Sequence, residues 1–187
     1  MPADLLLALW LGVSAPDPQP VTRRQLTRDT VIDGIACAPT GRASAEIHAN
    51  GVLAECPVPR DTVIAGQRLP AGTWIRLTDR RVLDGAWLPA DTELQGLRCR
   101  GTGFRGWAVR FHDSGRLALC YLAHDTVIDD IPCHGAWFWR ELTGSTYVSM
   151  HESGRLKSCR LARAITLEGV RYRKGARIER PAGEATS

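Results

Sequence analysis

Short runs of alternating apolar and polar residues recur along the chain, and turn-forming residues separate them. Residues 108–112 alternate, residues 113–115 (Asp-Ser-Gly) have turn chemistry, and residues 116–122 resume the alternation. Two alternating runs around such a turn predict a β-hairpin. Residues 126–128 predict a third short strand before the next turn. No window of a dozen residues in the body of the chain keeps a helical period, so the pattern predicts an all-β fold.

Two sequence phrases return along the chain in the same cycle. The first is Asp-Thr-x-Ile/Leu-x-Gly, whose copies, including one decayed copy, start 32, 30, 34 and 39 residues apart. The second is His-x-x-Gly-x-Leu-x-x-Cys. Agreement at this many positions indicates tandem duplication of one unit. The first phrase starts at Asp29, Asp61, Asp91, Asp125 and Ala164, and the second starts at His48, His112 and His151.

Each unit contains about three short strands, which are too few to be stable alone. Stacked units bury a shared apolar face. We therefore predict a tandem array of four to five three-stranded units over residues 26–180, arranged as an antiparallel β-meander or a β-solenoid. A short N-terminal apolar helix over residues 1–15 and a Pro-rich linker over residues 16–25 are predicted to precede it. Residues 181–187 are predicted to form a disordered tail.

The first fifteen residues have the features of a secretory signal. Residues 5–15 are apolar or small and too few to span a bilayer as a helix, and Val13-Ser14-Ala15 fits a small-x-small cleavage site. This predicts a periplasmic or secreted protein cleaved near Ala15. The alternative is a protein anchored by the apolar helix. The composition, 44% hydrophobic and 24% charged over 187 residues, excludes a disordered chain and an integral multi-span membrane protein.

The six cysteines occupy two recurring positions of the unit. One stands eight residues after the start of the first phrase, and the other ends the second phrase. The second unit has Leu69 and Ala86 there, so both cysteines are missing together, which favours pairing within a unit. Pairing between consecutive units would join only Cys120 to Cys133, and a cytosolic protein would hold buried free thiols instead. Three disulfides, typical of an oxidising compartment, are predicted: Cys37–Cys56, Cys99–Cys120 and Cys133–Cys159.

The net charge of +4 is unevenly placed. Nine basic and two acidic residues lie between Arg155 and Arg180, so this segment carries +7 and the rest of the chain −3. A basic end attracts anionic groups, so the predicted partner is a protein or an anionic envelope component; a solvated arginine-rich strand face is the alternative. No nucleic-acid motif accompanies the basic residues, and no nucleic-acid partner is predicted.

The motifs contain no evident catalytic centre or metal site. His112-Asp113-Ser114 has the residue types of a catalytic triad, but adjacent residues cannot align nucleophile, base and orienting group. Cys120 lies roughly 13 Å along its strand from Arg116, too far to share a zinc ion with His112. The hairpin histidines are expected to cap turns or face solvent. The aspartates of the first phrase are expected to hold Asx-type turns, with calcium binding as the alternative, so no cofactor or metal ion is predicted.

Aromatic residues beside arginines are the candidate binding residues. They lie in two loops that lengthen the third and fourth units. Loop aromatics of this kind are typical of binding surfaces, and they also serve as lids over the ends of small cores. The candidates are Trp107, Trp137, Phe138, Trp139, Arg105 and Arg140.

The hairpin phrase resembles the MORN-type repeats and related bacterial hairpin-repeat proteins, in which a strand, a glycine turn and a second strand recur. The likeness covers residues 26–180 but lacks that family's Tyr-x-Gly signature. It implies a binding or scaffolding surface rather than chemistry. We therefore expect an exported, non-enzymatic β-repeat protein acting as a binding or structural module in the cell envelope. Two alternatives stay open: a hydrolase combining a hairpin His with an Asp of a neighbouring unit, and a Cys/His metal-binding module.

Overall fold

The computed structural model describes residues 20–39, 44–102, 107–136 and 146–183. This part of the chain contains twenty β-strands and no helix, which confirms the all-β prediction. Among the same residues there is accordingly no helix long and apolar enough to cross a membrane. The predicted N-terminal helix and signal segment, and residues 184–187 of the predicted tail, lie outside the described residues.

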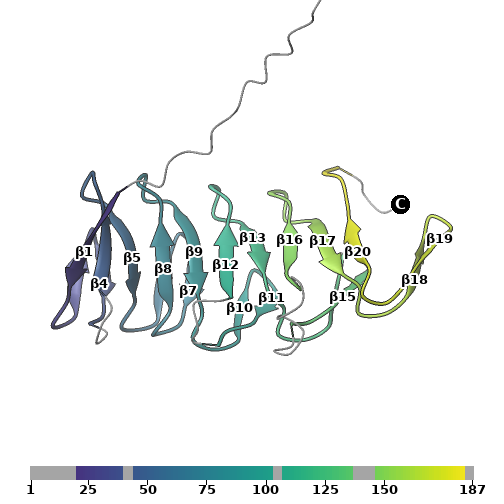
Figure 1. Cartoon of the computed structure of the whole chain (residues 1–187), viewed down its shortest axis with the longest axis horizontal. Coiled ribbons are helices and arrows are strands. Elements are labelled where there is room, and N and C mark those ends of the chain that lie inside the picture. The colour runs from purple at the N-terminus through teal and green to yellow at the C-terminus, as the bar shows by residue number, and fades with distance from the viewer. Residues whose placement is uncertain (1–19, 40–43, 103–106, 137–145, 184–187) are drawn as a thin grey trace, which may run out of the picture.

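Half of the strands form one antiparallel sheet in which every strand pairs with the next sheet strand along the chain (Figure 1). Of the two predicted arrangements, the sheet is therefore an antiparallel meander. The predicted hairpin over residues 108–122 is confirmed, because residues 108–111 and 117–120 form adjacent antiparallel strands of this sheet. The strands, in sheet order, are β1 (Val21–Gln25), β4 (Ser44–His48), β5 (Leu53–Pro57), β8 (Trp74–Leu77), β9 (Leu83–Trp87), β12 (Ala108–Phe111), β13 (Leu117–Cys120), β16 (Val148–Met150), β17 (Leu156–Arg160) and β20 (Arg177–Glu179).

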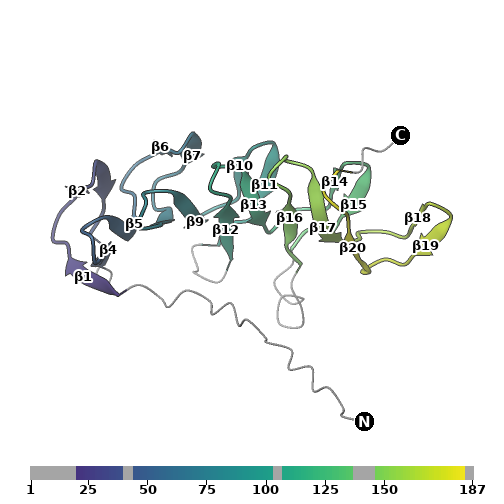
Figure 2. The same ribbon diagram turned by 90° about the horizontal axis from the view of Figure 1, so that it is seen from above.

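The other ten strands form five two-stranded hairpins, which we call arms 1 to 5. Each arm is inserted between two consecutive sheet strands, and Figure 2 shows arms 1 to 4 in a row on one side of the sheet. Every copy of the first phrase begins an arm. The arms are β2 (Thr30–Ile32) with β3 (Ile35–Cys37), β6 (Thr62–Ile64) with β7 (Gln67–Leu69), β10 (Thr92–Leu94) with β11 (Leu97–Cys99), β14 (Thr126–Ile128) with β15 (Ile131–Cys133), and β18 (Ile165–Leu167) with β19 (Val170–Tyr172).

The first phrase specifies the turn of each arm. Its last two residues both have positive φ, as at Asp33 (52°) and Gly34 (81°) in arm 1. Positive φ at both central residues defines the type I′ turn, whose twist matches that of the flanking strands. Arm 4 has Asp130 (64°) where the other arms have glycine. The turn lets a second three-residue strand pair with the first. Each of arms 1 to 4, together with the two sheet strands that follow it, therefore contains four strands instead of the three predicted for a unit.

The core lies between the arms and the sheet. Leu69 of arm 2 and Leu94 of arm 3 are at most 2% exposed, and they belong to one apolar cluster with sheet residues such as Ile75. The middle residue of the first strand of an arm points away from the core. Val31 in β2 and Val127 in β14 are accordingly 69% and 60% exposed. The alternation within a three-residue strand therefore separates core from solvent.

Tight turns join the remaining pairs of sheet strands. In three of these four turns a glycine with positive φ comes from the second phrase: Gly51, Gly115 and Gly154. The turn between β8 and β9 has Arg81 instead, with a φ of 65°. Beside each turn the pairing shifts by one residue, which is a β-bulge.

The folded part begins earlier than the sequence predicts. Residues 21–25 fall in the predicted Pro-rich linker, but they form β1, which pairs with β4 from Val21 to Gln25. All five side chains of β1 are exposed because the strand lies at the edge of the sheet. Its charged residues Arg23 and Arg24 are of the kind that discourages pairing with other chains at an open edge.

Candidate ligand-binding face

Five aromatic side chains follow one another on the solvent side of the sheet, and we call them the aromatic row. Trp74 and Trp87 are cross-strand partners on β8 and β9. Trp107 precedes β12, Tyr121 follows β13, and Tyr147 precedes β16. All five are half-buried, which leaves part of each ring accessible.

Three of the rings contact one another across the strands. The ring of Trp107 stacks on that of Tyr121 with 5.8 Å between centroids and 22° between planes. Tyr121 then meets Tyr147 edge to face, with the centroids 6.2 Å apart. Both arrangements are favoured by the aromatic quadrupole, so each ring fixes the position of its neighbour.

Three arginines lie over rings of the aromatic row. The guanidinium carbons of Arg76, Arg100 and Arg177 are 5.6, 5.5 and 4.6 Å from ring centroids. Their aromatic partners are Trp87, Trp107 and Tyr147, respectively. Stacking of a planar guanidinium on a ring holds positive charge next to apolar surface.

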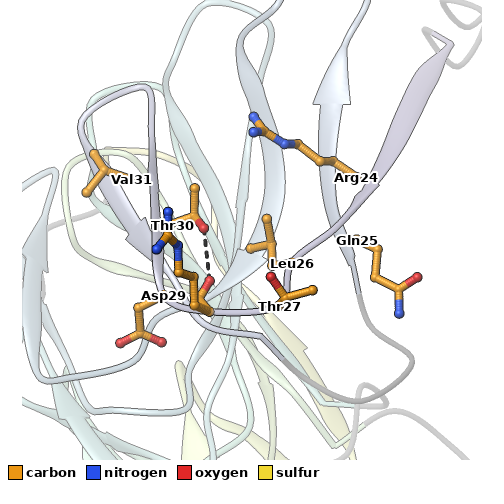
Figure 3. Close-up of a pocket in the computed structure, with 8 residues that line it drawn as sticks. Arg24, Gln25, Leu26, Thr27, Asp29, Thr30 and Val31 are labelled. Atoms are coloured by element: carbon orange, nitrogen blue, oxygen red, sulfur yellow. Dashed lines mark hydrogen bonds between the residues drawn. The ribbon is translucent and has the colours of Figure 1, made fainter.

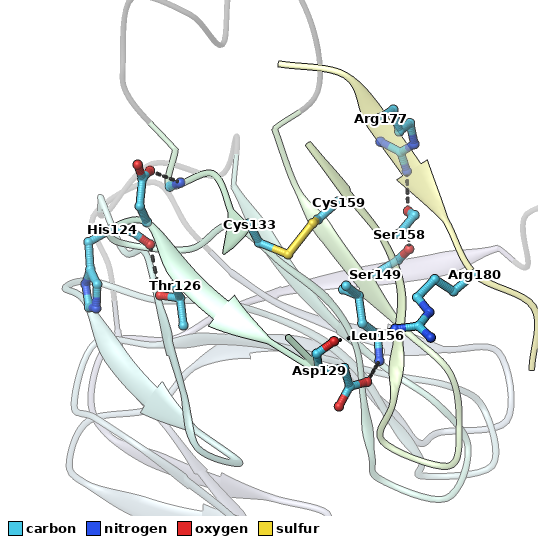
Figure 4. Close-up of a disulfide and its surroundings, with 12 residues drawn as sticks. His124, Thr126, Asp129, Cys133, Ser149, Leu156, Ser158, Cys159, Arg177 and Arg180 are labelled. Atoms are coloured by element: carbon cyan, nitrogen blue, oxygen red, sulfur yellow. Dashed lines mark hydrogen bonds between the residues drawn. A yellow bond between two sulfur atoms is a disulfide. The ribbon is translucent and has the colours of Figure 1, made fainter. Parts of the chain in front are cut away.

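Further contacts fix these guanidinium groups. Arg100 donates to the carbonyl oxygens of Ala136 (2.8 Å) and Ala123 (3.2 Å). Arg177 donates to Ser158 Oγ at 2.6 Å, as Figure 4 shows. The arginines of the face are therefore preorganised, which lowers the entropic cost of binding an anion.

Charges of both signs lie near the tryptophans, since Arg76 on β8 is the cross-strand partner of Glu55 on β5. Arg76 and Arg110 share one carboxylate, that of Asp84, at 2.6 and 3.4 Å. The basic segment predicted from Arg155 to Arg180 is not one patch, however. Arg155 pairs with Asp129 of arm 4, whereas other members of the segment lie on the sheet or on arm 5.

Of the predicted binding residues, only Trp107 lies among the described residues, and it belongs to the aromatic row. Trp137, Phe138, Trp139, Arg105 and Arg140 lie outside them. The other four rings of the row were missed from sequence. What marks these residues is that they face one another across strands on the outer side of the sheet. Recognising this requires the register of the sheet, and spacing along the chain does not provide the register. The four are Trp74, Trp87, Tyr121 and Tyr147.

The hairpin histidines connect neighbouring hairpins rather than capping turns. Their Nε2 atoms lie 2.8–3.0 Å from backbone carbonyl oxygens one hairpin further along the sheet. Because a carbonyl oxygen only accepts, Nε2 carries the hydrogen and donates it. The role of these rings in the fold is therefore to tie the sheet together. The pairs are His48 with Leu77, His112 with Met150, and His151 with Arg180.

In three of the five arms the aspartate of the first phrase closes the base of the arm instead of holding a local Asx turn. In arms 2, 3 and 4, Oδ1 accepts the backbone N–H ten residues further along, at 2.8–3.0 Å. In arm 1 the corresponding residue is Pro39, which has no N–H to donate. The described residues contain no group of three or more His, Cys, Asp or Glu side chains placed to hold a metal ion. The hydrogen-bonded pairs are Asp61 with Ala71, Asp91 with Gly101, and Asp125 with Gly135.

Asp125 also contacts His134, whose Nδ1 lies 2.6 Å from Oδ1. Burial pushes the pKa of Asp125 upward, but the Gly135 N–H and His134 outweigh it, so this pKa lies below the ordinary aspartate value. An Asp–His contact is a feature of hydrolases. The Asp125 carboxylate also makes the backbone bond that Asp61 and Asp91 make, so His134 adds a second partner to a contact that three arms share.

Two of the three predicted disulfides are formed. Cys37–Cys56 joins arm 1 to β5, and Cys133–Cys159, drawn in Figure 4, joins arm 4 to β17. The Cα atoms of each pair are 5.6 Å apart. The third prediction, Cys99–Cys120, is not met in this structure, where both residues are buried free thiols. Spacing along the chain predicts which cysteines meet but not their oxidation state.

A hollow of about 440 Å³ lies beside the first arm, away from the aromatic row (Figure 3). Residues 24–31 line it, and within it the Thr30 hydroxyl donates to the Arg28 carbonyl oxygen at 2.9 Å. Nearly all of these residues are exposed, and Leu26 is the only buried one. The hollow therefore lacks the desolvated polar groups of an active site.

Comparison with known proteins adds no family to this description. No family model matches the chain, and no curated protein or solved structure matches it either.

Proposed function

We propose that this chain is an exported, non-enzymatic binding module whose solvent-facing sheet holds an acidic polysaccharide of the cell envelope. The observation that carries the proposal is the aromatic row with its stacked arginines. Rings and guanidinium groups held side by side match a polymer that presents both sugar faces and carboxylate, sulfate or phosphate groups.

The dimensions of the row fit a polymer better than a small molecule. It runs across five consecutive strands of the sheet order, from Trp74 on β8 to Tyr147 beside β16. Four spacings of about 4.8 Å make this distance roughly 19 Å. A ligand of this length would lie across the strands rather than enter the fold.

The chemistry of the row suggests an anion that carries rings. Aromatic faces bind the C–H faces of sugars by burying apolar area, and Trp and Tyr provide this with little loss of rotamer freedom. Arginine recognises carboxylate, sulfate and phosphate through its planar fork of N–H donors. Arg100 and Arg177 place such forks directly beside Trp107 and Tyr147.

The compartment and the fold agree with this function. The two disulfides suggest an oxidising, extracellular-type environment. The signal-like segment over residues 1–15 and the resemblance to hairpin-repeat proteins support export and a binding or scaffolding role. A long sheet tied by disulfides is a rigid platform, as a binding face requires.

The experiment is a titration of the full chain with polygalacturonate, followed by tryptophan fluorescence and calorimetry. The matched control ligand is the fully methyl-esterified polymer, which keeps the sugar rings and removes the charge. We expect at least tenfold tighter binding of the acidic polymer, and weakening with added salt. Equal binding of both polymers, or binding of oligo-dT alone, would overturn the proposal.

Variants separate the face from general charge. Tyr121→Ala and Arg177→Gln are expected to weaken binding of polygalacturonate by about tenfold each, since each removes a central contact. Val31→Ala and Val127→Ala, on the exposed side of the arms, are the matched controls and are expected to bind as the parent does. Equal loss in both sets, or loss confined to the arm variants, would contradict the proposal.

A further inference from the structure

The two free thiols lie in the middle of the molecule, between arm 3 and the sheet. Cys99 ends β11 and Cys120 ends β13, and both are 0% exposed. The two side chains are neighbours, and Cys120 is the main cause of the pKa shift of Cys99. Its effect, together with burial, raises the pKa of Cys99 far above the ordinary thiol value.

The backbone around this pair is arranged as it is around the two formed disulfides. In all three places the residue after the arm cysteine donates its N–H to the carbonyl of the residue after the sheet cysteine, at 2.6–2.8 Å. The bonded pairs have Cα atoms 5.6 Å apart, within the usual range for a disulfide. The three hydrogen bonds are Ala38 to Pro57, Arg100 to Tyr121, and His134 to Arg160.

A second match extends the comparison to arm 4. Ala123 donates to the Arg98 carbonyl as Ala162 donates to that of Pro132, both at 2.8 Å. The isolated bridges Cys99–Leu122 and Cys133–Leu161 are also equivalent. Closing a bond between Cys99 and Cys120 therefore requires no change in backbone register.

We propose that Cys99 and Cys120 are a third cross-link site that is oxidised by thiol–disulfide exchange before arm 3 packs on the sheet, and is inert once the arm has packed. The oxidant is a low-molecular-weight disulfide such as oxidised glutathione. One cysteine thiolate attacks a sulfur of the reagent and releases one reagent thiol. The second cysteine attacks the mixed disulfide and releases the other, so two electrons and two protons pass to the reagent.

The order of events follows from burial. Exchange requires a thiolate and open access to its sulfur. The folded chain gives no access to either sulfur, because both side chains are fully buried, and the raised pKa of Cys99 disfavours its thiolate as well. The unfolded chain offers both, so oxidant that is present during folding reaches the pair. This site is independent of the proposed ligand.

The first test counts thiols in the refolded full chain. Reduced, unfolded protein is refolded in mixtures of reduced and oxidised glutathione, alkylated with N-ethylmaleimide in denaturant, and measured by intact mass and peptide mapping. We expect a species without alkylated cysteines that contains the Cys99–Cys120 peptide pair. Alkylation of both residues at every glutathione ratio, while the other two bonds form, would overturn the proposal.

The second test examines the order of events with Cys99→Ala, which leaves Cys120 as a single thiol. Oxidised glutathione is added either to the unfolded chain or after folding, and the mixed disulfide at Cys120 is followed by mass. We expect modification to be slower after folding by on the order of 100-fold. Equal rates would overturn the inert folded state. Cys120→Ala, which leaves Cys99, provides the same measurement if the first variant does not fold.

Discussion

A new disulfide can be introduced where the second unit lacks one. Leu69 ends β7 of arm 2, and Ala86 lies on β9. In arms 1, 3 and 4 and in the sheet strands β5, β13 and β17, cysteines occupy the corresponding positions. Both are buried, at 1% and 0% exposure. Ala86 faces Val109 across the sheet as Cys56 faces Ile75, so the register is the same. We therefore expect the double variant Leu69→Cys/Ala86→Cys to form a bond between arm 2 and the sheet.

The magnitude follows from the closed loop. Residues 69 to 86 enclose a loop of 17 residues. The loss of chain entropy in the unfolded state then stabilises the protein by about 3 kcal/mol. For a chain of this size that corresponds to a rise in Tm of roughly 6–12 °C. The Tm of the double variant is compared with that of the single variant Leu69→Cys. Both variants lose the same leucine side chain, so that cost cancels in the difference.

The assay is thermal unfolding of the oxidised variants, with thiol counting and peptide mapping. The control is Arg68→Cys/Ala86→Cys, because residue 68 is one position along β7 and points to the opposite side of the arm. The control is expected to form no bond. A double variant without a bond between 69 and 86, or a bond that leaves Tm unchanged, would refute the equivalence of arm 2 with arms 1, 3 and 4.

Three further changes test individual contacts. Asp130→Gly is expected to stabilise the protein by about 1 kcal/mol in urea unfolding, because residue 130 has a φ of 64° that glycine adopts without strain. Gly135→Ala should cost about 2 kcal/mol in the same assay, because a Cβ there would lie 2.5 Å from the carbonyl carbon of His124; an unchanged midpoint would contradict this close approach. Asp125 has a lowered pKa, so its stabilising effect is present above the ordinary aspartate pKa and is lost as pH falls through the lower folded value. Asp125→Asn should therefore be less stable than the parent at pH 7 and differ less from it at pH 2; a difference independent of pH would contradict the assignment.

Local signals in the sequence predicted the strands with strong patterns and two of the disulfides. They missed the second strand of each arm, because three residues are too few to show a period. Ile131–Cys133 illustrates this, since Pro132 in its middle argues against a strand by composition alone. The strand β1 was assigned to the linker because all five of its side chains are exposed and no alternation marks it.

The candidate site was predicted only at Trp107. The remaining rings of the aromatic row are far apart in sequence, and they meet because the meander places Trp74 opposite Trp87 and brings Tyr121 to Tyr147. Register in a sheet depends on turns and bulges along the whole chain, so local patterns do not fix which outward residues become neighbours. The same reason explains why the basic segment, continuous in sequence, is divided between the sheet and arm 5.

The most direct measurement of the central claim is hydroxyl-radical footprinting of the full chain with and without polygalacturonate. If the sheet face binds the polymer, Trp107, Tyr121 and Tyr147 become protected, while Tyr172 of arm 5 is modified at an unchanged rate. Protection of Tyr172 with unchanged modification of the three rings would contradict the account.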